Sequence, residues 1–247
     1  MRTFGLIGFP VSHSFSPAWF KAKFEREKIS DAQYHLFPLE KIKQLPHLLE
    51  EHPNLLGLNV TIPHKQNVLE FLDSLDPQAQ KVQAVNTIRI GKKEDGFPLL
   101  EGFNTDIGGF TGSLKPLLKD HHRKALVLGT GGASLAVLAG LKELGIESQL
   151  ISRTPGPNQL SYQGLDKDLL EEYPLIVNTT PLGTFPSKSS PQLPYKGIGQ
   201  QHLLYDLVYN PEITPFLQKG LDAGASIKNG LEMLEIQAAL SWEIWNS

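Results

Sequence analysis

Two short polar segments hold a lysine and an aspartate that could exchange a proton with an alcohol. Lys65 ends the segment 58–65, and Asp106 ends the tripeptide Asn104-Thr105-Asp106. Neither segment has the spacing of a metal-ligand set, so we expect no metal site. An ammonium held by a carboxylate can pass a proton to and from a substrate hydroxyl. If folding brings the two side chains together, they predict acid-base chemistry.

Each of these residues also has a simpler interpretation. Lys65 could be a solvated charge at the start of a helix, where it is mildly unfavourable with the helix dipole. Asp106 could cap the helix that follows it, a role that is compatible with catalysis. His13 and His64 are lone imidazoles beside better candidates, and we expect them to support the site at most.

A glycine-rich turn predicts a dinucleotide site. The segment 129–134 follows an apolar strand and opens a helix, where backbone N–H groups bind a pyrophosphate. Gly129, Gly131 and Gly132 carry the pattern, while Ser134 stands where the strict fingerprint has Gly or Ala. The same glycines could serve a plain tight turn. A hydride acceptor together with an alcohol proton makes a dehydrogenase.

The end of the next predicted strand bears on the choice of cofactor. Ser152, Arg153 and Thr154 stand where an NAD enzyme usually carries an acid for the ribose 2′-OH. The guanidinium of Arg153 suits a 2′-phosphate, and the neighbouring hydroxyls add donors. The position favours NADP, and an arginine merely exposed at a strand end is the simpler alternative.

The composition disfavours several classes of function. Hydrophobic residues make up 40% and charged residues 20% of the 247 residues, as in ordinary globular chains. The net charge of -3, from 23 basic and 26 acidic residues, disfavours nucleic-acid binding. No apolar run suits a signal peptide or a membrane span, and there is no cysteine. We expect a soluble, unprocessed cytoplasmic chain without nucleic-acid or membrane partners.

Alternating strands and helices predict an α/β protein with two domains. In the first part of the chain, strands alternate with helices before a hairpin, and Ser16 before Pro17 predicts a helix cap. The expected elements are strands over 4–9, 33–38 and 55–60, helices over 18–28 and 39–52, and a hairpin of 84–90 with 99–103 at the sheet edge.

A long helix from residue 105 leads into a second α/β pattern, the mononucleotide-binding half of a doubly wound sheet. We expect a substrate domain with a mainly parallel sheet over 1–103 and 230–247, and a Rossmann-type nucleotide-binding domain over 104–229. The other expected elements are strands over 125–128, 147–152 and 175–178, a helix over 132–144, and a helix over 231–245 that packs back onto the first domain.

Neutral hydrogen-bonding side chains gather near the expected strand ends, where open α/β sheets bind ligands. Each one alone is more typical of a turn or cap than of a ligand site. Together they suit a small polyol. These residues are Ser14, Ser16, Asn59, Thr61 and Asn86.

Ordered blocks along nearly the whole chain resemble the shikimate dehydrogenase family, NADP-linked enzymes of aromatic amino-acid biosynthesis. Coincidence does not account for so many blocks in the same order. Besides the glycine-rich turn, the blocks are SHSFSP (12–17), NVTIPHK (59–65), AVNT (84–87), GFNTD (102–106), NTTPLG (178–183), DLVYNP (206–211) and NGLEMLEIQA (229–238).

The resemblance implies reversible, NADPH-dependent reduction of 3-dehydroshikimate to shikimate in chorismate biosynthesis, with Lys65 and Asp106 as the catalytic pair. Lys65 would give or relay the proton to the carbonyl oxygen. The implied substrate residues are Ser14 and Ser16 for the carboxylate, and Asn59, Thr61, Asn86, Gln237 and Tyr209 around the ring. The implied NADP-binding residues are Gly129, Gly131, Gly132, Ala133, Ser152, Arg153, Thr154 and Gly230.

The sequence departs from the family pattern in three places. Many members carry a second basic residue soon after the arginine, but here Pro-Gly-Pro-Asn follows at 155–158, so NADP has fewer cationic partners. Ser152 replaces the commoner Asn beside Arg153. Glu232 replaces a common Gly at an expected helix start, where an acid is electrostatically favoured.

Two alternatives stay open. One is an NAD-dependent quinate/shikimate dehydrogenase, which would carry a carboxylate near the position of Arg153. The other is a non-catalytic nucleotide-sensing module, against which the retention of both Lys65 and Asp106 speaks. We expect a small-molecule substrate and a chain that is a monomer or a homodimer.

Overall fold

The computed structural model describes residues 1–247, which divide into two compact units. The first unit comprises Met1–Thr105 with Gln237–Ser247, and the second comprises Asp106–Ile236. The sequence predicted boundaries after residues 103 and 229. The first lies close to the observed division after Thr105, and the second lies before the observed division after Ile236. The second division falls inside helix α8 (Leu231–Trp245), whose two halves belong to different hydrophobic clusters.

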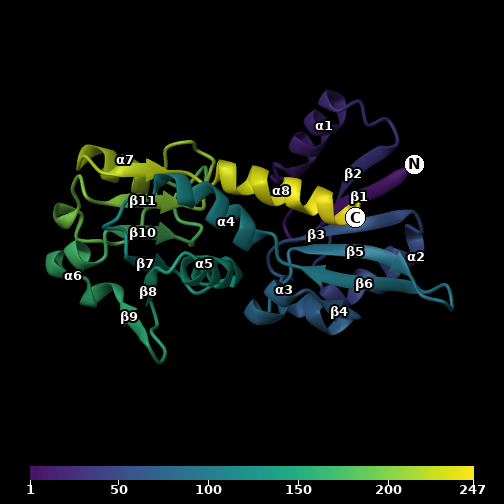
Figure 1. Cartoon of the computed structure of the whole chain (residues 1–247), viewed down its shortest axis with the longest axis horizontal. Coiled ribbons are helices and arrows are strands. Elements are labelled where there is room, and N and C mark those ends of the chain that lie inside the picture. The colour runs from purple at the N-terminus through teal and green to yellow at the C-terminus, as the bar shows by residue number, and fades with distance from the viewer. The chain divides into compact units, whose positions relative to one another are not determined.

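The first unit is built around a six-stranded sheet in the order β2-β1-β3-β5-β6-β4 (Figure 1). The β1–β2, β1–β3 and β4–β6 pairs are parallel, and β5 is antiparallel to both β3 and β6. The strands are β1 (Arg2–Gly8), β2 (Ala32–Pro38), β3 (Leu55–Val60), β4 (Ser74–Leu75), β5 (Thr87–Lys92) and β6 (Pro98–Phe103).

The predicted hairpin exists as β5 and β6, but its predicted place at the sheet edge is wrong. The strand β4 pairs with β6 on the outer side and forms the edge. A strand of two residues leaves no periodic pattern in the sequence, so it could not be predicted.

Short helices complete the first unit, and one prediction about them is wrong. Phe15, not Ser16, occupies the cap position of the first helix, and it makes no side-chain cap bond. Ser16 is instead the first helical residue and is buried. The helices are α1 (Ser16–Arg26), η1 (Ile42–Gln44), α2 (Leu45–Glu51), η2 (Asn67–Phe71) and α3 (Pro77–Val82).

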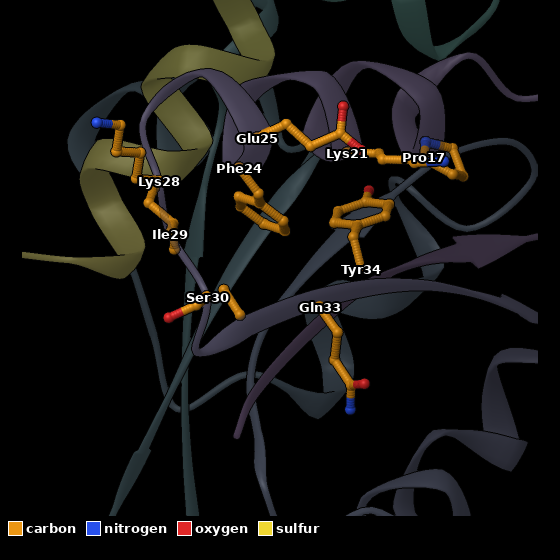
Figure 2. Close-up of a pocket in the computed structure, with 10 residues that line it drawn as sticks. Pro17, Lys21, Phe24, Glu25, Lys28, Ile29, Ser30, Gln33 and Tyr34 are labelled. Carbon is orange, nitrogen blue, oxygen red and sulfur yellow. The ribbon is translucent and has the colours of Figure 1, made fainter.

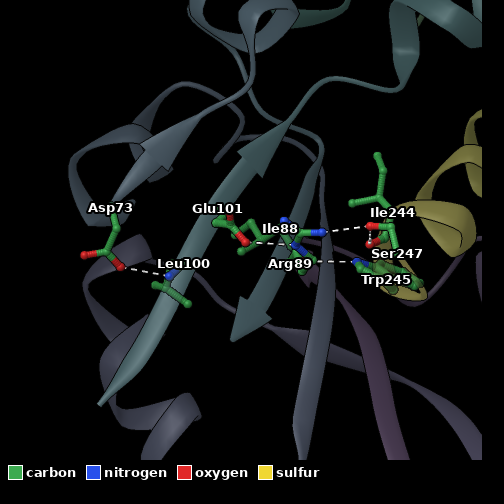
Figure 3. A network of polar contacts seen from close by, with 8 residues as sticks. All are labelled: Asp73, Ile88, Arg89, Leu100, Glu101, Ile244, Trp245 and Ser247. Carbon is green, nitrogen blue, oxygen red and sulfur yellow. Dashed lines mark hydrogen bonds and ion pairs between the residues drawn. The ribbon is translucent and has the colours of Figure 1, made fainter. Parts of the chain in front are cut away.

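The end of the chain is tied to β5 (Figure 3). Trp245 Nε1 donates to the Ile88 carbonyl at 2.9 Å, and Arg89 Nη1 donates to Ser247 Oγ at 2.8 Å. Arg89 Nε also donates to Glu101 Oε2 at 2.8 Å. The predicted packing of the last helix onto the first domain is therefore confirmed for its C-terminal half. The hydrophobic cluster that includes this half of α8 contains Phe4, Phe20, Phe24, Ala238 and Trp245.

The second unit contains a six-stranded, all-parallel sheet in the order β12-β11-β10-β7-β8-β9 (Figure 1). This is the strand order of a doubly wound nucleotide-binding fold, so the predicted fold class is confirmed. One hydrophobic cluster includes side chains of α4 and α5, and another includes side chains of α6 and α7. None of the helices is long and apolar enough to span a membrane.

The strands are β7 (Lys124–Leu128), β8 (Glu147–Ser152), β9 (Gln159–Ser161), β10 (Leu175–Asn178), β11 (Leu203–Asp206) and β12 (Ser226–Lys228). The helices besides α8 are α4 (Asp106–Leu114), η3 (Lys115–Leu117), α5 (Gly132–Glu143), η4 (Tyr162–Gly164), α6 (Lys167–Glu172), η5 (Tyr195–Gly197) and α7 (Pro215–Asp222).

Candidate active site

The loops that follow β1 and β3 are joined by backbone hydrogen bonds. Thr61 N donates to the Ile7 carbonyl at 2.9 Å, and Phe9 N donates to the Ile62 carbonyl at 3.0 Å. Because β1 and β3 are parallel, both loops leave the same edge of the sheet. This carboxyl edge is where open α/β sheets bind ligands.

Lys65 lies in the turn before η2, so its predicted place at a helix start is wrong. The chain first closes a turn in which His64 N donates to the Thr61 carbonyl at 2.9 Å. The Lys65 carbonyl accepts from Val85 N at 2.8 Å. His64 is 2% exposed, and its Nε2 lies 2.6 Å from the Leu39 carbonyl, so the ring supports this turn.

A buried network of amides and hydroxyls connects three predicted substrate residues, Asn59, Asn86 and Gln237. Asn59 Nδ2 lies 2.9 Å from Ser241 Oγ and 3.3 Å from Thr87 Oγ1. It also lies 3.3 Å from the Asn86 carbonyl. Asn86 Nδ2 donates to Gln237 Oε1 at 3.2 Å. The connected set belongs entirely to the first unit.

Thr105 joins the same network immediately before Asp106 in the chain. Thr105 N donates to Asn86 Oδ1 at 2.7 Å, and Asn86 Nδ2 donates to Thr105 Oγ1 at 2.9 Å. Asn104 Nδ2 donates to the Ala84 carbonyl at 2.9 Å. The Asn104 side chain therefore holds the end of β6 against the segment before β5. Asp106 is 7% exposed and opens α4, where an acid is favoured by the helix dipole.

Ser14 lies in the loop that enters α1, and Ser16 is the first residue of that helix. Ser16 N donates to Ser14 Oγ at 3.3 Å. Tyr34 Oη donates to Asn59 Oδ1 at 2.8 Å, and the Ser16 side chain opposes the rise that burial causes in the pKa of Tyr34. The structure therefore brings two predicted substrate residues near a tyrosine that sequence reasoning missed.

In the second unit, the glycine-rich turn joins β7 to α5. Gly129 has a φ of +105°, and a Cβ there would lie 2.8 Å from the Thr180 side chain. Gly131 precedes α5 without a side-chain cap, and a Cβ there would meet nothing within 4 Å. Gly132 and Ala133 begin the helix and supply its first N–H groups. Open space before an uncapped helix N-terminus fits a pyrophosphate.

Ser134 does not disturb this turn, although it departs from the strict glycine fingerprint. It is 1% exposed, and its hydroxyl donates to the Gly131 carbonyl at 2.7 Å. The hydroxyl therefore points back into the turn and helps to hold it.

Arg153 is exposed just beyond β8, in a turn that its neighbours close. Ser152 Oγ donates to the Thr154 carbonyl at 3.0 Å and accepts from Thr154 N at 3.2 Å. Burial raises the pKa of the Tyr162 phenol, and the nearby charge of Arg153 opposes that shift. Ser152 thus shapes the turn, while the guanidinium is presented to solvent beside an aromatic residue.

The adjacent strands β10 and β11 end in a buried polar pair that sequence reasoning missed. Asn178 and Asp206 are paired in register, and Asn178 Nδ2 donates to Asp206 Oδ1 at 2.9 Å. Thr214 Oγ1 donates to Asp206 Oδ2 at 2.6 Å, and Val208 N donates to Oδ1 at 3.1 Å. Asp206 is fully buried, and burial raises its pKa to about 6. No strand was predicted over 203–206. Only a strand there, parallel to 175–178, would have placed Asn178 and Asp206 side by side.

Tyr209 and Gly230 also belong to the second unit. Tyr209 is half-buried in the loop after β11. Gly230 is buried, and a Cβ there would lie 2.1 Å from the Leu207 carbonyl oxygen. Close packing against the backbone is thus a structural reason for glycine at this position.

Comparison with known proteins identifies the family. Residues 6–88 match the model of the shikimate dehydrogenase substrate binding domain. Over 99% of its length the chain is 35% identical to the shikimate dehydrogenase (NADP(+)) of Caldanaerobacter subterraneus subsp. tengcongensis, and it covers 91% of that protein. The chain belongs to the shikimate dehydrogenase family.

Solved structures of shikimate dehydrogenases share the fold. The Aquifex aeolicus enzyme has a TM-score of 0.87 at 30% identity, with 100% of this chain and 92% of that one covered. The Thermus thermophilus enzyme, in complex with NADP(H) and shikimate, has a TM-score of 0.85 at 34% identity, with 99% and 93% covered. The predicted membership of the shikimate dehydrogenase family is confirmed.

Proposed function

We propose that this family member catalyses the reversible, NADPH-dependent reduction of 3-dehydroshikimate to shikimate. The main observation behind the proposal is the buried network of neutral amides and hydroxyls around Asn59 and Asn86. Lys65 is tied to Val85, the chain neighbour of Asn86. Neutral hydrogen-bonding groups suit the hydroxyls of a polyol, and an ammonium close by in the fold suits proton transfer to its oxygen.

The catalytic roles fall to Lys65 and Asp106. Lys65 gives a proton to the ketone oxygen during reduction and removes it from the shikimate hydroxyl in the reverse direction. Asp106 holds the ammonium by charge and hydrogen bonding. NADPH, when bound, supplies the hydride that reduces the carbonyl carbon. The substrate-binding roles fall to Ser14, Ser16, Asn59, Thr61, Asn86, Tyr209 and Gln237.

The first unit serves as the substrate-binding and catalytic domain in this proposal, and the second as the NADP-binding domain. The turn at 129–133 holds the pyrophosphate through backbone N–H groups, and Arg153 pairs with the 2′-phosphate. Ser152, Thr154 and Gly230 complete the cofactor site. Supporting the choice of NADP, relatives that match over nearly the whole chain are NADP-dependent shikimate dehydrogenases.

Partners and location follow from the same proposal. The chain acts on a small molecule as a monomer or a homodimer, without nucleic acid. The lack of cysteine suits the reducing cytoplasm in which we place it.

The test is the absorbance of reduced nicotinamide after shikimate and NADP are added to the purified chain. We expect the absorbance to rise, and to rise faster with NADP than with NAD. Silence at saturating concentrations of both ligands would support a nucleotide-sensing module. A clear preference for NAD, with quinate as a second substrate, would support the quinate/shikimate alternative.

A further inference from the structure

Tyr34, on β2, contacts the predicted substrate residue Asn59 inside the first unit. Its hydroxyl donates to Asn59 Oδ1 at 2.8 Å. Ser16 is 7% exposed and Asn59 is 5% exposed, so solvent has little access to either polar group. The hydrogen bond between Tyr34 and Asn59 is therefore part-buried, where leaving it unmade is costly.

The amide of Asn59 can face in only one direction. Its nitrogen lies 3.3 Å from the Asn86 carbonyl, which can only accept a hydrogen bond, so the NH₂ group must be on that side. Asn59 Oδ1 therefore faces Tyr34, and the phenol must donate to it. The amide hydrogens have further acceptors in Thr87 Oγ1 at 3.3 Å and Ser241 Oγ at 2.9 Å.

This arrangement limits what Asn59 can offer a ligand. An amide NH₂ group has two hydrogens, and acceptors inside the protein engage both. The oxygen has two lone pairs, of which Tyr34 engages one. Asn59 can thus accept a hydrogen bond from a substrate hydroxyl, but it has no hydrogen left to donate.

The Tyr34 phenol stays protonated at this position. Burial raises the pKa of Tyr34, so the residue stays protonated and keeps its hydrogen for Asn59. With its one hydrogen donated, the Tyr34 oxygen can only accept from other groups, and the Ser16 side chain opposes the rise in its pKa. Tyr34 therefore orients the Asn59 amide on β3.

The ring of Tyr34 is held by contacts that do not involve its hydroxyl. It stacks on Phe20 with a centroid distance of 4.2 Å and an interplanar angle of 11°. It also lines a pocket of about 660 Å³ together with Lys21 and Phe24 of α1, and Figure 2 shows the ring between β2 and α1. Phenylalanine at this position would keep the ring packing and remove only the oxygen.

We propose that Tyr34 is a positioning residue of the substrate site, which makes Asn59 an acceptor for one substrate hydroxyl. This inference rests on the proposed function, because Asn59 is a substrate residue only there. Tyr34 itself does not touch the substrate. Its effect should therefore appear in substrate affinity and should pass through Asn59.

The first experiment measures initial rates of the full-length Tyr34→Phe variant with shikimate and NADP. We expect the KM for shikimate to rise about three- to tenfold, as for the loss of one buried hydrogen bond, with kcat and the KM for NADP within about twofold of wild type. Tyr195→Phe is the matched control. It removes a tyrosine hydroxyl that donates to the Pro191 carbonyl at 2.8 Å in the second unit.

A double-mutant cycle tests whether the effect passes through Asn59. In the Asn59→Ala background, Tyr34→Phe should raise the KM for shikimate by less than half as much, on a logarithmic scale, as it does in wild type. An effect of full size in that background would overturn the inference.

The outcomes separate this inference from the proposed function. Wild-type turnover of shikimate with an unchanged KM in Tyr34→Phe would overturn the inference alone. A parallel rise in the KM for NADP, or a Tyr34→Phe chain that does not fold, would assign Tyr34 a merely structural role and also overturn it. Absence of wild-type turnover would overturn the proposed function, and the inference with it.

Discussion

Lys65 is a half-buried lysine in the turn before η2. Stability alone gives little reason for a lysine there, because ammonium groups are usually solvated. Val85 N donates a hydrogen bond to the Lys65 carbonyl at 2.8 Å. Because Val85 precedes Asn86 in the chain, this bond holds the Lys65 backbone near the network. This combination favours a chemical role over a structural one.

Substitution of Lys65 tests that role directly. Lys65→Ala should lower kcat about 10²- to 10⁴-fold, the usual contribution of a general acid or base, while the KM for shikimate changes much less. Steady-state kinetics with the exposed Lys43→Ala variant as control provide the measurement. A loss confined to KM would contradict proton transfer by Lys65.

Arg153 tests the choice between the two dinucleotides. Arg153→Ala should raise the KM for NADP roughly ten- to a hundredfold, because a charge-assisted pair with the 2′-phosphate is lost. The KM for NAD, which lacks that phosphate, should change little. The exposed Arg123→Ala variant in the same unit serves as control. An unchanged KM for NADP would remove Arg153 from the cofactor site.

At the scale of elements, stability and cofactor binding place different requirements on the residue before α5. Gly131 has φ −79° and ψ 177°, a conformation open to any residue, and a Cβ there meets nothing within 4 Å. The fold alone therefore does not require glycine at this position. Close approach of a pyrophosphate does require a small, uncharged residue.

A matched pair of substitutions exploits this difference. Gly131→Asp and Gly131→Asn both supply good helix caps and should leave the unfolding temperature near that of wild type. Only the aspartate adds a negative charge where the pyrophosphate would lie, so it should weaken NADP binding at least about tenfold more than the asparagine. Calorimetric titration and thermal unfolding measure the two effects. Equal NADP affinities would place the cofactor elsewhere.

The ends of β10 and β11 make a second element-scale prediction, about pH. Asp206 has a folded pKa of about 6, above its ordinary value of 3.8, so the folded chain binds this proton more readily than the unfolded chain. The group's contribution to stability is therefore full below about pH 4. It is lost as the pH rises through 6, by up to about 3 kcal/mol.

Asp206→Asn removes that titration while keeping the size of the side chain. The free energy of unfolding of the variant, relative to wild type, should increase between pH 4 and pH 7 by up to about 3 kcal/mol. Urea unfolding of both proteins across this range measures the difference. Parallel curves would show that Asp206 does not titrate between pH 4 and pH 7.

At the scale of the whole molecule, the chain has a hydrophobic core in each unit and divides the predicted ligand residues between them. Asn59, Asn86 and Gln237 belong to the first unit, and Gly131 and Arg153 belong to the second. Each ligand should therefore stabilise the protein in the absence of the other.

Thermal unfolding with single ligands tests this division. A ligand at a hundredfold its Kd stabilises a folded protein by about 2.7 kcal/mol, so shikimate alone and NADP alone should each raise the unfolding temperature. Asn59→Ala should abolish the shift from shikimate and keep the shift from NADP, while Arg153→Ala should weaken only the shift from NADP. Loss of both shifts in either variant would contradict separate sites.

Features that depend on neighbouring residues in the chain could be predicted from the sequence, and features that depend on distant residues could not. The strands 55–60, 147–152 and 175–178 were predicted with their observed bounds. Apolar residues dominate 55–60 and 175–178, and the alternation of strands and helices indicated 147–152 after the helix at 132–144. The glycine turn at 129–132 was predicted because its chemistry lies within a few residues. The cap at Ser16 was mispredicted, because the helix begins one residue earlier than the local Ser-Pro pattern indicates, with Phe15 at the cap.

The amino-acid sequence by itself determined the family, the α/β class and the cofactor turn, since periodic apolar runs and ordered local motifs encode these. Only the tertiary structure decided which polar groups meet. Asn59 and Ser241 stand 182 residues apart, and Asn178 meets Asp206 through the register of two parallel strands. Such contacts depend on strand order and on the return of α8 to the first unit, which no local pattern specifies.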